Sequence, residues 1–164
     1  MERNVYAEQI KKHFFFLIEE LGFVMLHERY FPDLMGNSDI VFQSKNVGVR
    51  CLLDRGIVEV RIGPVAMPME KWFDLSIIVG FLAPNAPSTL FFSADDFFSD
   101  QGKTSDDEWT EKQVKRLAQI ARGYCEPVLR GEFERWQELG QFRERKGELE
   151  YKRLTGKDYP KGRT

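Results

Sequence analysis

Residues 39–62, DIVFQSKNVGVRCLLDRGIVEVRI, contain three short runs in which apolar and polar side chains alternate. The dipeptides Lys45-Asn46 and Arg55-Gly56 separate these runs and have the length of two-residue hairpin turns. With both turns in place, the two hairpins put the same residues on one apolar face, an agreement that a shift of one residue would destroy. The stretch therefore predicts three strands of an antiparallel meander, residues 39–44, 47–54 and 57–62. Their shared apolar face consists of Ile40, Phe42, Val49, Cys51, Leu53, Val58, Val60 and Ile62.

The opposite face of this meander carries charged side chains beside two aliphatic ones. The same registers put Arg50 directly opposite Arg61, which is unfavourable unless acids lie between them. One interpretation is a solvated ladder of ion pairs, typical of the outer face of an antiparallel sheet and weak in energy. The other is an anion-binding site in which Arg50 and Arg61, together with Glu59, hold a ligand. The residues of this face are Asp39, Val41, Arg50, Leu52, Glu59 and Arg61.

The rest of the chain predicts another strand and several helices around the meander. Apolar side chains at steps of three and four residues indicate the helices. Glycine and proline mark their ends. The expected elements are a helix over residues 4–21, a strand over 23–30, a helix over 69–82, a short strand over 88–92 and, from Ser105 onward, helices that Gly123 and Pro127 interrupt, the last over 132–154.

Together these patterns predict a single α+β domain. A four-stranded antiparallel meander would pack its apolar face on the N-terminal helix and part of the second helix, with the C-terminal helices alongside. Residues 1–140 would form this domain. Residues 141–164, with eight Lys or Arg against four acids, would form a basic C-terminal helix extension and tail of the same domain.

The composition is that of an ordinary soluble domain. The 164 residues are 42% hydrophobic and 30% charged, and 24 Lys plus Arg against 26 Asp plus Glu give a net charge of −2. These values exclude collagen-like and wholly disordered chains, and the near-neutral balance argues against nucleic acid as the partner. The longest apolar stretch, residues 75–83, is shorter than the roughly 20 residues of a membrane span. Cys51 and Cys125 have no C-x-x-C spacing and fit reduced thiols, so we expect a cytoplasmic protein without a membrane.

The sequence lacks the patterns that indicate catalysis. His13 and His27 stand 14 residues apart without a neighbouring cysteine, unlike the ligands of a metal site. The acids around Gly102 do not follow the ligand positions of an EF-hand calcium loop. Neither a glycine-rich phosphate motif nor a G-x-S-x-G nucleophile motif occurs, and Cys51 falls on the apolar face of a strand. We therefore expect no enzyme, no metal and no other cofactor.

One segment has an unusual composition. Residues 93–111 hold seven acids and one base, a local charge of −6, with aromatic side chains among and beside them. In one interpretation the rings are core anchors, and the acids only solubilise the loop between them. In the other, the rings supply rigid contact area, and the acids steer a protein partner with a basic surface toward it. The candidate partner-binding residues, which we call the acidic aromatic segment, are Phe91, Phe92, Asp95, Asp96, Phe97, Phe98, Asp100, Asp106, Asp107 and Trp109.

Several short motifs resemble those of a group of small proteins. They are Gly22-Phe23 after the first helix, Asp54-Arg55-Gly56 and Glu59-Val60 in the meander, and Leu129-Arg130-Gly131-Glu132-Phe133 before Trp136 and Leu139. In this layout, residues 4–139 resemble small, mostly uncharacterised bacterial cytosolic proteins, some of which are similar to immunity proteins that neutralise a cognate toxin. The resemblance implies a binding protein and carries no catalytic residue.

The favoured expectation is a non-enzymatic cytoplasmic binding protein, with an immunity-like role as one form of it. It would contact a basic partner surface through the acidic aromatic segment. The alternative is a small-molecule or anion-binding enzyme that uses Arg50, Glu59 and Arg61 on the open sheet face. A concave pocket around the arginines would favour the enzyme, and a flat ladder the binding protein. Contact of the basic tail with RNA or an acidic partner ranks third, because interspersed acids dilute its charge.

Overall fold

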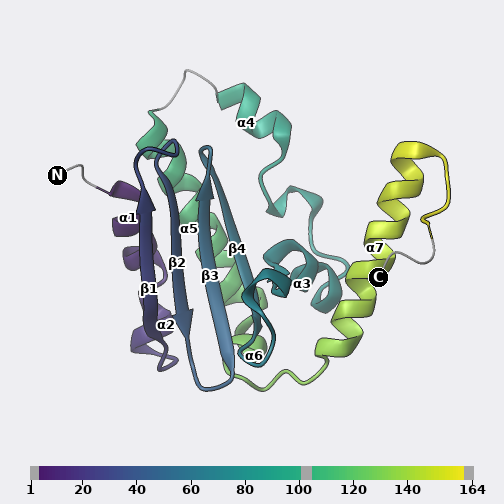
Figure 1. The fold of residues 1–164 in the computed structure, drawn as a ribbon, viewed down its shortest axis with the longest axis horizontal. Coiled ribbons are helices and arrows are strands. Elements are labelled where there is room, and N and C mark those ends of the chain that lie inside the picture. Colours follow the sequence, from purple (N-terminus) through teal and green to yellow (C-terminus); the bar gives the residue numbers. More distant parts are fainter. Residues whose placement is uncertain (1–3, 101–104, 161–164) are drawn as a thin grey trace. The chain divides into compact units, whose positions relative to one another are not determined.

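The structure, a computed structural model, describes residues 4–100 and 105–160, without the side chains of Phe98 and Asp100. The chain divides into two compact units, Met1–Phe133 and Glu134–Thr164. The first unit holds an antiparallel sheet in the strand order β1-β2-β3-β4-β5 (Figure 1). The fold class is α+β with an antiparallel sheet, as predicted, but the sheet has a fifth strand. The strands are β1 (Val24–Phe31), β2 (Asn37–Gln43), β3 (Val47–Asp54), β4 (Ile57–Pro64) and β5 (Phe73–Asp74).

The two central hairpins have the registers that the alternation predicts. Ile40 pairs with Cys51 and Phe42 with Val49 between β2 and β3. Cys51 pairs in turn with Val60 between β3 and β4. All five side chains are almost completely buried. The apolar face deduced from the sequence is therefore the core face of the sheet.

Helices cover this core face, which is turned away from the viewer in Figure 1. The predicted continuous helix over residues 4–21 is wrong, because it breaks at Phe14, where φ is −100° and ψ is 11°. The break buries Phe14 and Phe16 in the core, whereas Phe15 is 51% exposed. The helices that contact the sheet or one another here are α1 (Val5–His13), α2 (Phe15–Glu19), α5 (Asp106–Tyr124) and α6 (Glu126–Leu129).

The region predicted as a second helix, residues 69–82, divides into three elements. A 3-10 turn, η1 (Met69–Lys71), leads to the short strand β5, and helix α3 (Leu75–Leu82) begins only after it. Asp74 is the N-cap of α3, because its carboxylate accepts hydrogen bonds from the Ser76 backbone N–H at 2.8 Å and from the Ser76 hydroxyl at 2.6 Å. The prediction of one helix is wrong because Trp72 and Phe73, directly before this cap, are extended, and β5 adds a strand to the sheet.

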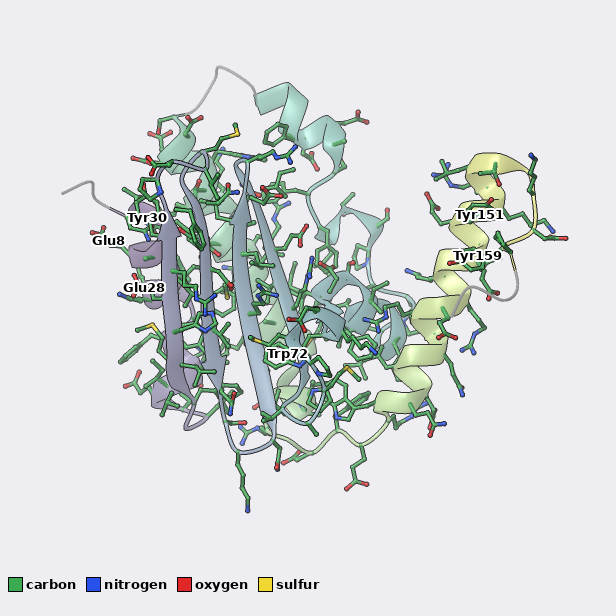
Figure 2. The ribbon with its side chains drawn as sticks, viewed as in Figure 1. Glu8, Glu28, Tyr30, Trp72, Tyr151 and Tyr159 are labelled. Carbon is green, nitrogen blue, oxygen red and sulfur yellow. The ribbon has the colours of Figure 1, made fainter. Side chains whose placement is uncertain are left out.

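Trp72 covers one end of the open face, the face of the sheet opposite the helices (Figure 2). Gly48 on β3 and Gly63 on β4 are directly paired, and a Cβ atom on either would overlap the Trp72 indole. The indole N–H donates to the carbonyls of Pro64 and Met67, both at 3.0 Å. Two facing glycines thus form the platform on which Trp72, 4% exposed, fixes the chain just before β5.

The described residues between α3 and α5 hold two short helical elements, whereas the sequence predicts a strand over residues 88–92 and then a loop. The Asp96 amide donates to the Ser93 hydroxyl, and the Asp96 carboxylate accepts from the Ser93 amide at 2.8 Å. This reciprocal pair begins a helix in the manner of a capping box. Ser105, from which the sequence predicts helices, accepts from the Glu108 amide and is the N-cap of α5. The observed elements are η2 (Ser88–Leu90), a 3-10 turn, and α4 (Ala94–Asp100).

Among the described residues of the second unit, one helix is present, α7 (Trp136–Thr155). Helix α7 begins four residues later than predicted. It ends at Gly156, whose φ of 69° suits a glycine helix end. Ion pairs between neighbouring turns lie on its surface, such as Arg153 with Glu150 at 2.6 Å.

Candidate functional site

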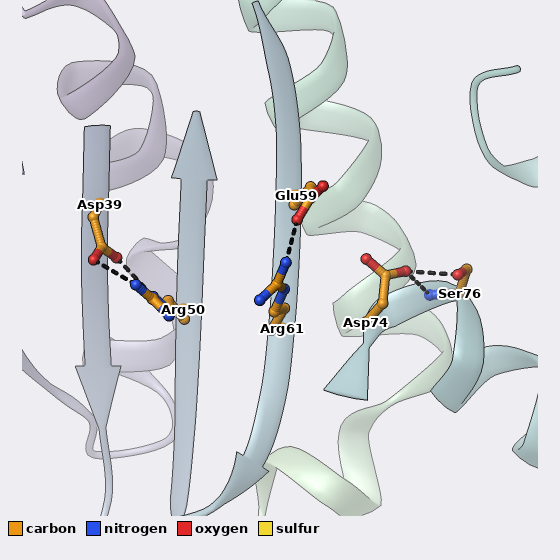
Figure 3. Close-up of polar contacts among 6 residues, drawn as sticks. All are labelled: Asp39, Arg50, Glu59, Arg61, Asp74 and Ser76. Carbon is orange, nitrogen blue, oxygen red and sulfur yellow. Dashed lines mark hydrogen bonds and ion pairs between the residues drawn. The ribbon is translucent and has the colours of Figure 1, made fainter. Parts of the chain in front are cut away.

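The charged residues of the open face form two ion pairs (Figure 3). Arg50 and Arg61 lie directly opposite each other on β3 and β4, as predicted. Arg50 contacts Asp39 on β2 through two hydrogen bonds, from Nε to Oδ1 at 3.0 Å and from Nη2 to Oδ2 at 2.9 Å. Arg61 donates from Nη2 to Glu59 Oε2 at 2.8 Å. Each guanidinium therefore has a carboxylate partner within the sheet.

This pairing offers an anion little attraction. Asp39 is only 8% exposed, and its hydrogen bonds raise the pKa of Arg50, while burial opposes the rise. Two guanidinium groups opposed by two carboxylates carry no net positive charge. His27 on β1 extends the same row, with Nε2 at 3.6 Å from Asp39 Oδ2. The geometry favours the ladder interpretation over the anion site.

Glu59 also lines a cavity of about 500 Å³, which lies between β4, the start of α3, α4 and α5. Its wall is mostly apolar. Four of the five predicted aromatic residues meet there, although they are spread over 19 positions of sequence. The side chain of the fifth, Phe98, lies outside the described part. β4 contributes Ile57, Val58, Glu59 and Val60 to the wall, and the acidic aromatic segment contributes Phe91, Phe92, Phe97 and Trp109.

Trp109, on the first turn of α5, is the centre of the aromatic wall. Its ring centroid lies 5.0 Å from that of Phe92 and 5.8 Å from that of Phe97. The Arg116 guanidinium lies over the Phe92 ring, 3.7 Å from its centroid. The buried indole Nε1 of Trp109 has no hydrogen-bond partner among the described residues. These rings are half-buried, which is intermediate between core anchors and a fully open surface.

The predicted acids lie on the surface around this wall. Asp95, Asp106 and Asp107 are exposed, the last two in the first turn of α5, where the helix dipole favours negative charge. Asp96 is bound to Ser93, and these hydrogen bonds lower the pKa of its carboxyl. The side chain of Asp100 and residues 101–104 lie outside the described part. The structure thus brings the predicted rings together and leaves the described acids outside the cavity.

Gln113 is a site residue that the sequence analysis missed. Its side-chain Oε1 accepts from the Val58 backbone N–H at 3.0 Å, and its Nε2 donates to the Gly56 carbonyl at 2.8 Å. The amide therefore binds the edge of β4 as a neighbouring strand would. The available signal was a polar residue within the apolar stripe of α5, beside Val114.

A second groove was also missed. It has a volume of about 480 Å³ and adjoins the cavity, since Phe92 and Trp109 line both spaces. Lys112, Lys115 and Arg116 give this groove a basic wall. Their spacing of three and four residues places them on one face of α5, so the sequence carried this signal.

The titratable groups at the cavity are engaged in other contacts. Glu59 pairs with Arg61, and Asp74 caps α3.

The two cysteines lie outside the lining of the cavity. Burial raises the pKa of the Cys51 thiol and raises that of Cys125 to about 12, so neither is a ready nucleophile. Within the described residues, no group of three His, Cys, Asp or Glu side chains could hold a metal ion. What the cavity offers is apolar contact area with a few polar groups, an arrangement that suits binding.

No protein-family model, curated protein or solved structure matches this chain. Across the described residues, each helix is too short or too polar to cross a membrane. A function for this chain therefore rests on the chemistry of its site.

Proposed function

We propose that this chain is a non-enzymatic cytoplasmic binding protein that contacts a partner with a basic surface through the acidic aromatic segment. The observation that carries the proposal is the cavity, because four aromatic side chains of that segment form one of its walls. Its volume of about 500 Å³ lies within the range of ligand sites, roughly 300–1,000 Å³. An apolar recess beside exposed acids suits a partner that presents an apolar side chain among basic ones.

The acids and the rings would act at different stages of binding. Exposed carboxylates attract a basic partner from a distance and raise its association rate, an effect that salt screens. Apolar contacts inside the cavity form only after docking and therefore slow dissociation. The proposal thus assigns the association rate to Asp95, Asp106 and Asp107, and the lifetime of the complex to Phe92 and Trp109.

An immunity-like role is one form of this function. The resemblance of residues 4–139 implies a protein that neutralises a toxin by forming a stoichiometric complex with it. Such a role needs a stable complex and no bond-making. A few rigid aromatic anchors that exclude water supply most of the binding energy in complexes of this kind. The half-buried rings of the cavity wall are suited to act as such anchors.

The test begins with capture of the partner from the native host on immobilised protein, followed by kinetics with the purified partner. The variant carries Asp95→Asn, Asp106→Asn and Asp107→Asn, and omits Asp96 because that residue caps α4. We expect association to slow about tenfold at low salt, with little change in the free energy of unfolding.

The matched control carries the same change in charge at exposed acids outside the segment, Glu19→Gln, Asp33→Asn and Glu132→Gln. We expect this control to associate nearly as fast as the wild type. Equal association rates for the two triple variants would reject the acidic aromatic segment as the contact surface. Turnover of a metabolite by the purified protein would reject the binding role itself.

A further inference from the structure

The charged side chains that line the cavity are both acids. They are Glu59 on β4 and Asp74 at the end of β5, and among the described residues the lining holds no lysine, arginine or histidine. The other polar side chains of the lining, such as those of Ser76 and Gln113, are uncharged. The wall of the cavity therefore carries negative charge, although most of its surface is apolar.

The sheet places the two acids on the same face. β5 is two residues long and pairs with Arg61 and Ile62 alone, so the lining residues 57–60 of β4 have no strand beside them in the described part of the chain. Asp74 pairs with Arg61, and Glu59 lies two residues before Arg61, so Glu59 and Asp74 are diagonal neighbours. Such neighbours lie roughly 7–8 Å apart. A cation between the two side chains can therefore contact both carboxylates.

Each carboxylate has one oxygen left for a ligand. Arg61 donates to Oε2 of Glu59, and Ser76 donates to one oxygen of Asp74, Oδ1, through its backbone N–H and its hydroxyl. Within the described residues, no hydrogen bond reaches Oε1 of Glu59 or Oδ2 of Asp74, and Figure 3 shows the second oxygen of Asp74 on the side of β4. Arg61 is not part of the lining and offsets only one of the two negative charges. The pair therefore keeps an excess negative charge and two free acceptors.

The aromatic wall adds a second attraction for a cation. The faces of aromatic rings carry partial negative charge and attract ammonium groups, and the rings also pack against the apolar groups of a ligand. The four rings are Phe91, Phe92, Phe97 and Trp109. A molecule with an apolar body and a cationic group would therefore find both of its parts matched in the same cavity.

We infer that the cavity binds a small organic ammonium ion with an aromatic or branched apolar body. The ammonium group would donate to Oε1 of Glu59 and Oδ2 of Asp74, and the body would lie against Phe92 and Trp109. An anion would be repelled by the two carboxylates, and a neutral molecule would leave their charge without a counterion, so charge complementarity selects the cation. The inference goes beyond the proposed function because it gives the cavity a free ligand, which would compete with the partner for the same rings.

The test compares three probes of similar size on the full chain, phenethylamine, phenethyl alcohol and hydrocinnamate, each titrated by NMR at neutral pH. The probes share a phenyl group and end in an ammonium, a hydroxyl and a carboxylate group, respectively. We expect the amine to bind with a Kd of about 1 mM or lower, and about tenfold more tightly than the alcohol. Hydrocinnamate should bind more weakly than the alcohol, because the acids of the cavity repel it.

Two substitutions remove the negative charges and keep the hydrogen bonds. Glu59→Gln retains an oxygen for Arg61, and Asp74→Asn retains an oxygen for Ser76, since asparagine also caps helices well. We expect each substitution to weaken binding of the amine about threefold to tenfold, and to change binding of the alcohol less than about twofold. Asp95→Asn is the matched control, because Asp95 is an exposed acid outside the lining. It should change the affinity for the amine less than about twofold.

A structural readout locates the bound amine. The indole N–H resonance of Trp109, which lines the cavity, should shift during the titration. The indole N–H resonance of Trp72 should stay fixed, because Trp72 lies outside the lining and donates to two backbone carbonyls. The same Trp72 resonance shows that each variant remains folded.

Four results would overturn the inference. They are no binding of the amine at about 10 mM, equal affinities for the amine and the alcohol, an amine affinity that neither Glu59→Gln nor Asp74→Asn changes, and a resonance shift at Trp72 without one at Trp109. None of these results touches the association kinetics of the captured partner with the aspartate variants. Failure of the cation site is therefore distinguishable from failure of the proposed function.

Discussion

The two edges of the sheet differ in how they meet the solvent. β1 is an outer strand of eight residues whose side chains are mostly exposed, among them Leu26 and Phe31. Its pairing with β2 shifts between Met25 and His27, which marks a bulge, and Glu28 on β1 pairs with Lys11 of α1 at 2.8 Å. Bulges and charges are the devices by which proteins prevent unwanted pairing at an edge.

The β4 edge has the opposite character. Its unpaired part is short and concave, and apolar rings and Gln113 surround it. A long edge with a bulge and charges resists a new strand, whereas the open part of the β4 edge is short and lies within a cavity. The comparison shows that the two edges differ in their surroundings as well as in the number of unpaired residues.

The largest loss of stability is expected at Trp72, which fixes the chain just before β5. Trp72→Ala should lower the free energy of unfolding by about 3–5 kcal/mol, because it removes a buried ring and the two hydrogen bonds that fix the chain before β5. Denaturant unfolding measures this loss. The control Phe15→Ala removes an exposed ring and should cost less than about 1 kcal/mol. Similar losses for the two variants would show that Trp72 does not anchor this edge.

A smaller loss of stability is expected at Gln113, whose side-chain amide binds backbone groups at the edge of β4. Gln113→Ala leaves the Val58 N–H and the Gly56 carbonyl without their partner, so the free energy of unfolding should fall by about 1–3 kcal/mol. Gln119→Ala, at an exposed position of the same helix, is the control and should change it by less than about 0.5 kcal/mol. An unchanged free energy of unfolding in Gln113→Ala would mean that water replaces the side-chain amide at this edge.

At the other edge, removal of charge should alter association more than stability. The double variant Glu28→Val and Arg29→Val makes β1 an apolar edge while keeping the net charge, so self-association should increase with concentration. Sedimentation velocity measures this change. Glu144→Val with Arg145→Val adds the same side chains to an exposed stretch of α7 and is the matched control. Equal association of both variants would indicate general stickiness instead of strand pairing.

The smallest change in stability is expected at α4, which contributes Ala94 and Phe97 to the lining of the cavity beside β4. Because hydrogen bonds from Ser93 lower the pKa of Asp96 in the folded chain, their contribution to stability is present at neutral pH and is lost as pH falls through that lowered pKa. The protection factor of the Ser93 amide, measured by NMR hydrogen exchange, should therefore decrease as the pH falls from neutral to acidic. Asp96→Asn should abolish this dependence, and its persistence in the variant would assign it to another group.

The meander was predictable because its information is local. Two-residue turns and a period of two fix which side chains share a face, and positive φ at Arg55 and Gly56 agrees with a tight hairpin turn. β5 was not predictable in this way. Trp72 and Phe73 continue an apolar stripe of helical spacing, and only the pairing of β5 with β4 overrides that pattern.

The candidate site was predictable in part. Composition alone pointed to the rings of the acidic aromatic segment, because so many aromatics among acids are unusual. Gln113 contacts Val58 and Gly56 across 55 and 57 positions of sequence, and the rings are also distant from β4 in sequence, so no local pattern exists for these contacts. The helix α4 was missed because Ser and Asp favour caps and turns, and here they form the cap itself.

The indole stacked on two glycines restricts how this chain can change over generations. A substitution at Gly48 or Gly63 that adds even one methyl group displaces the ring, and loss of the ring leaves both glycines exposed and poorly suited to a strand. The three positions are therefore expected to vary together or not at all. A distant descendant that has replaced Trp72 with a small residue should carry larger side chains at both glycine positions.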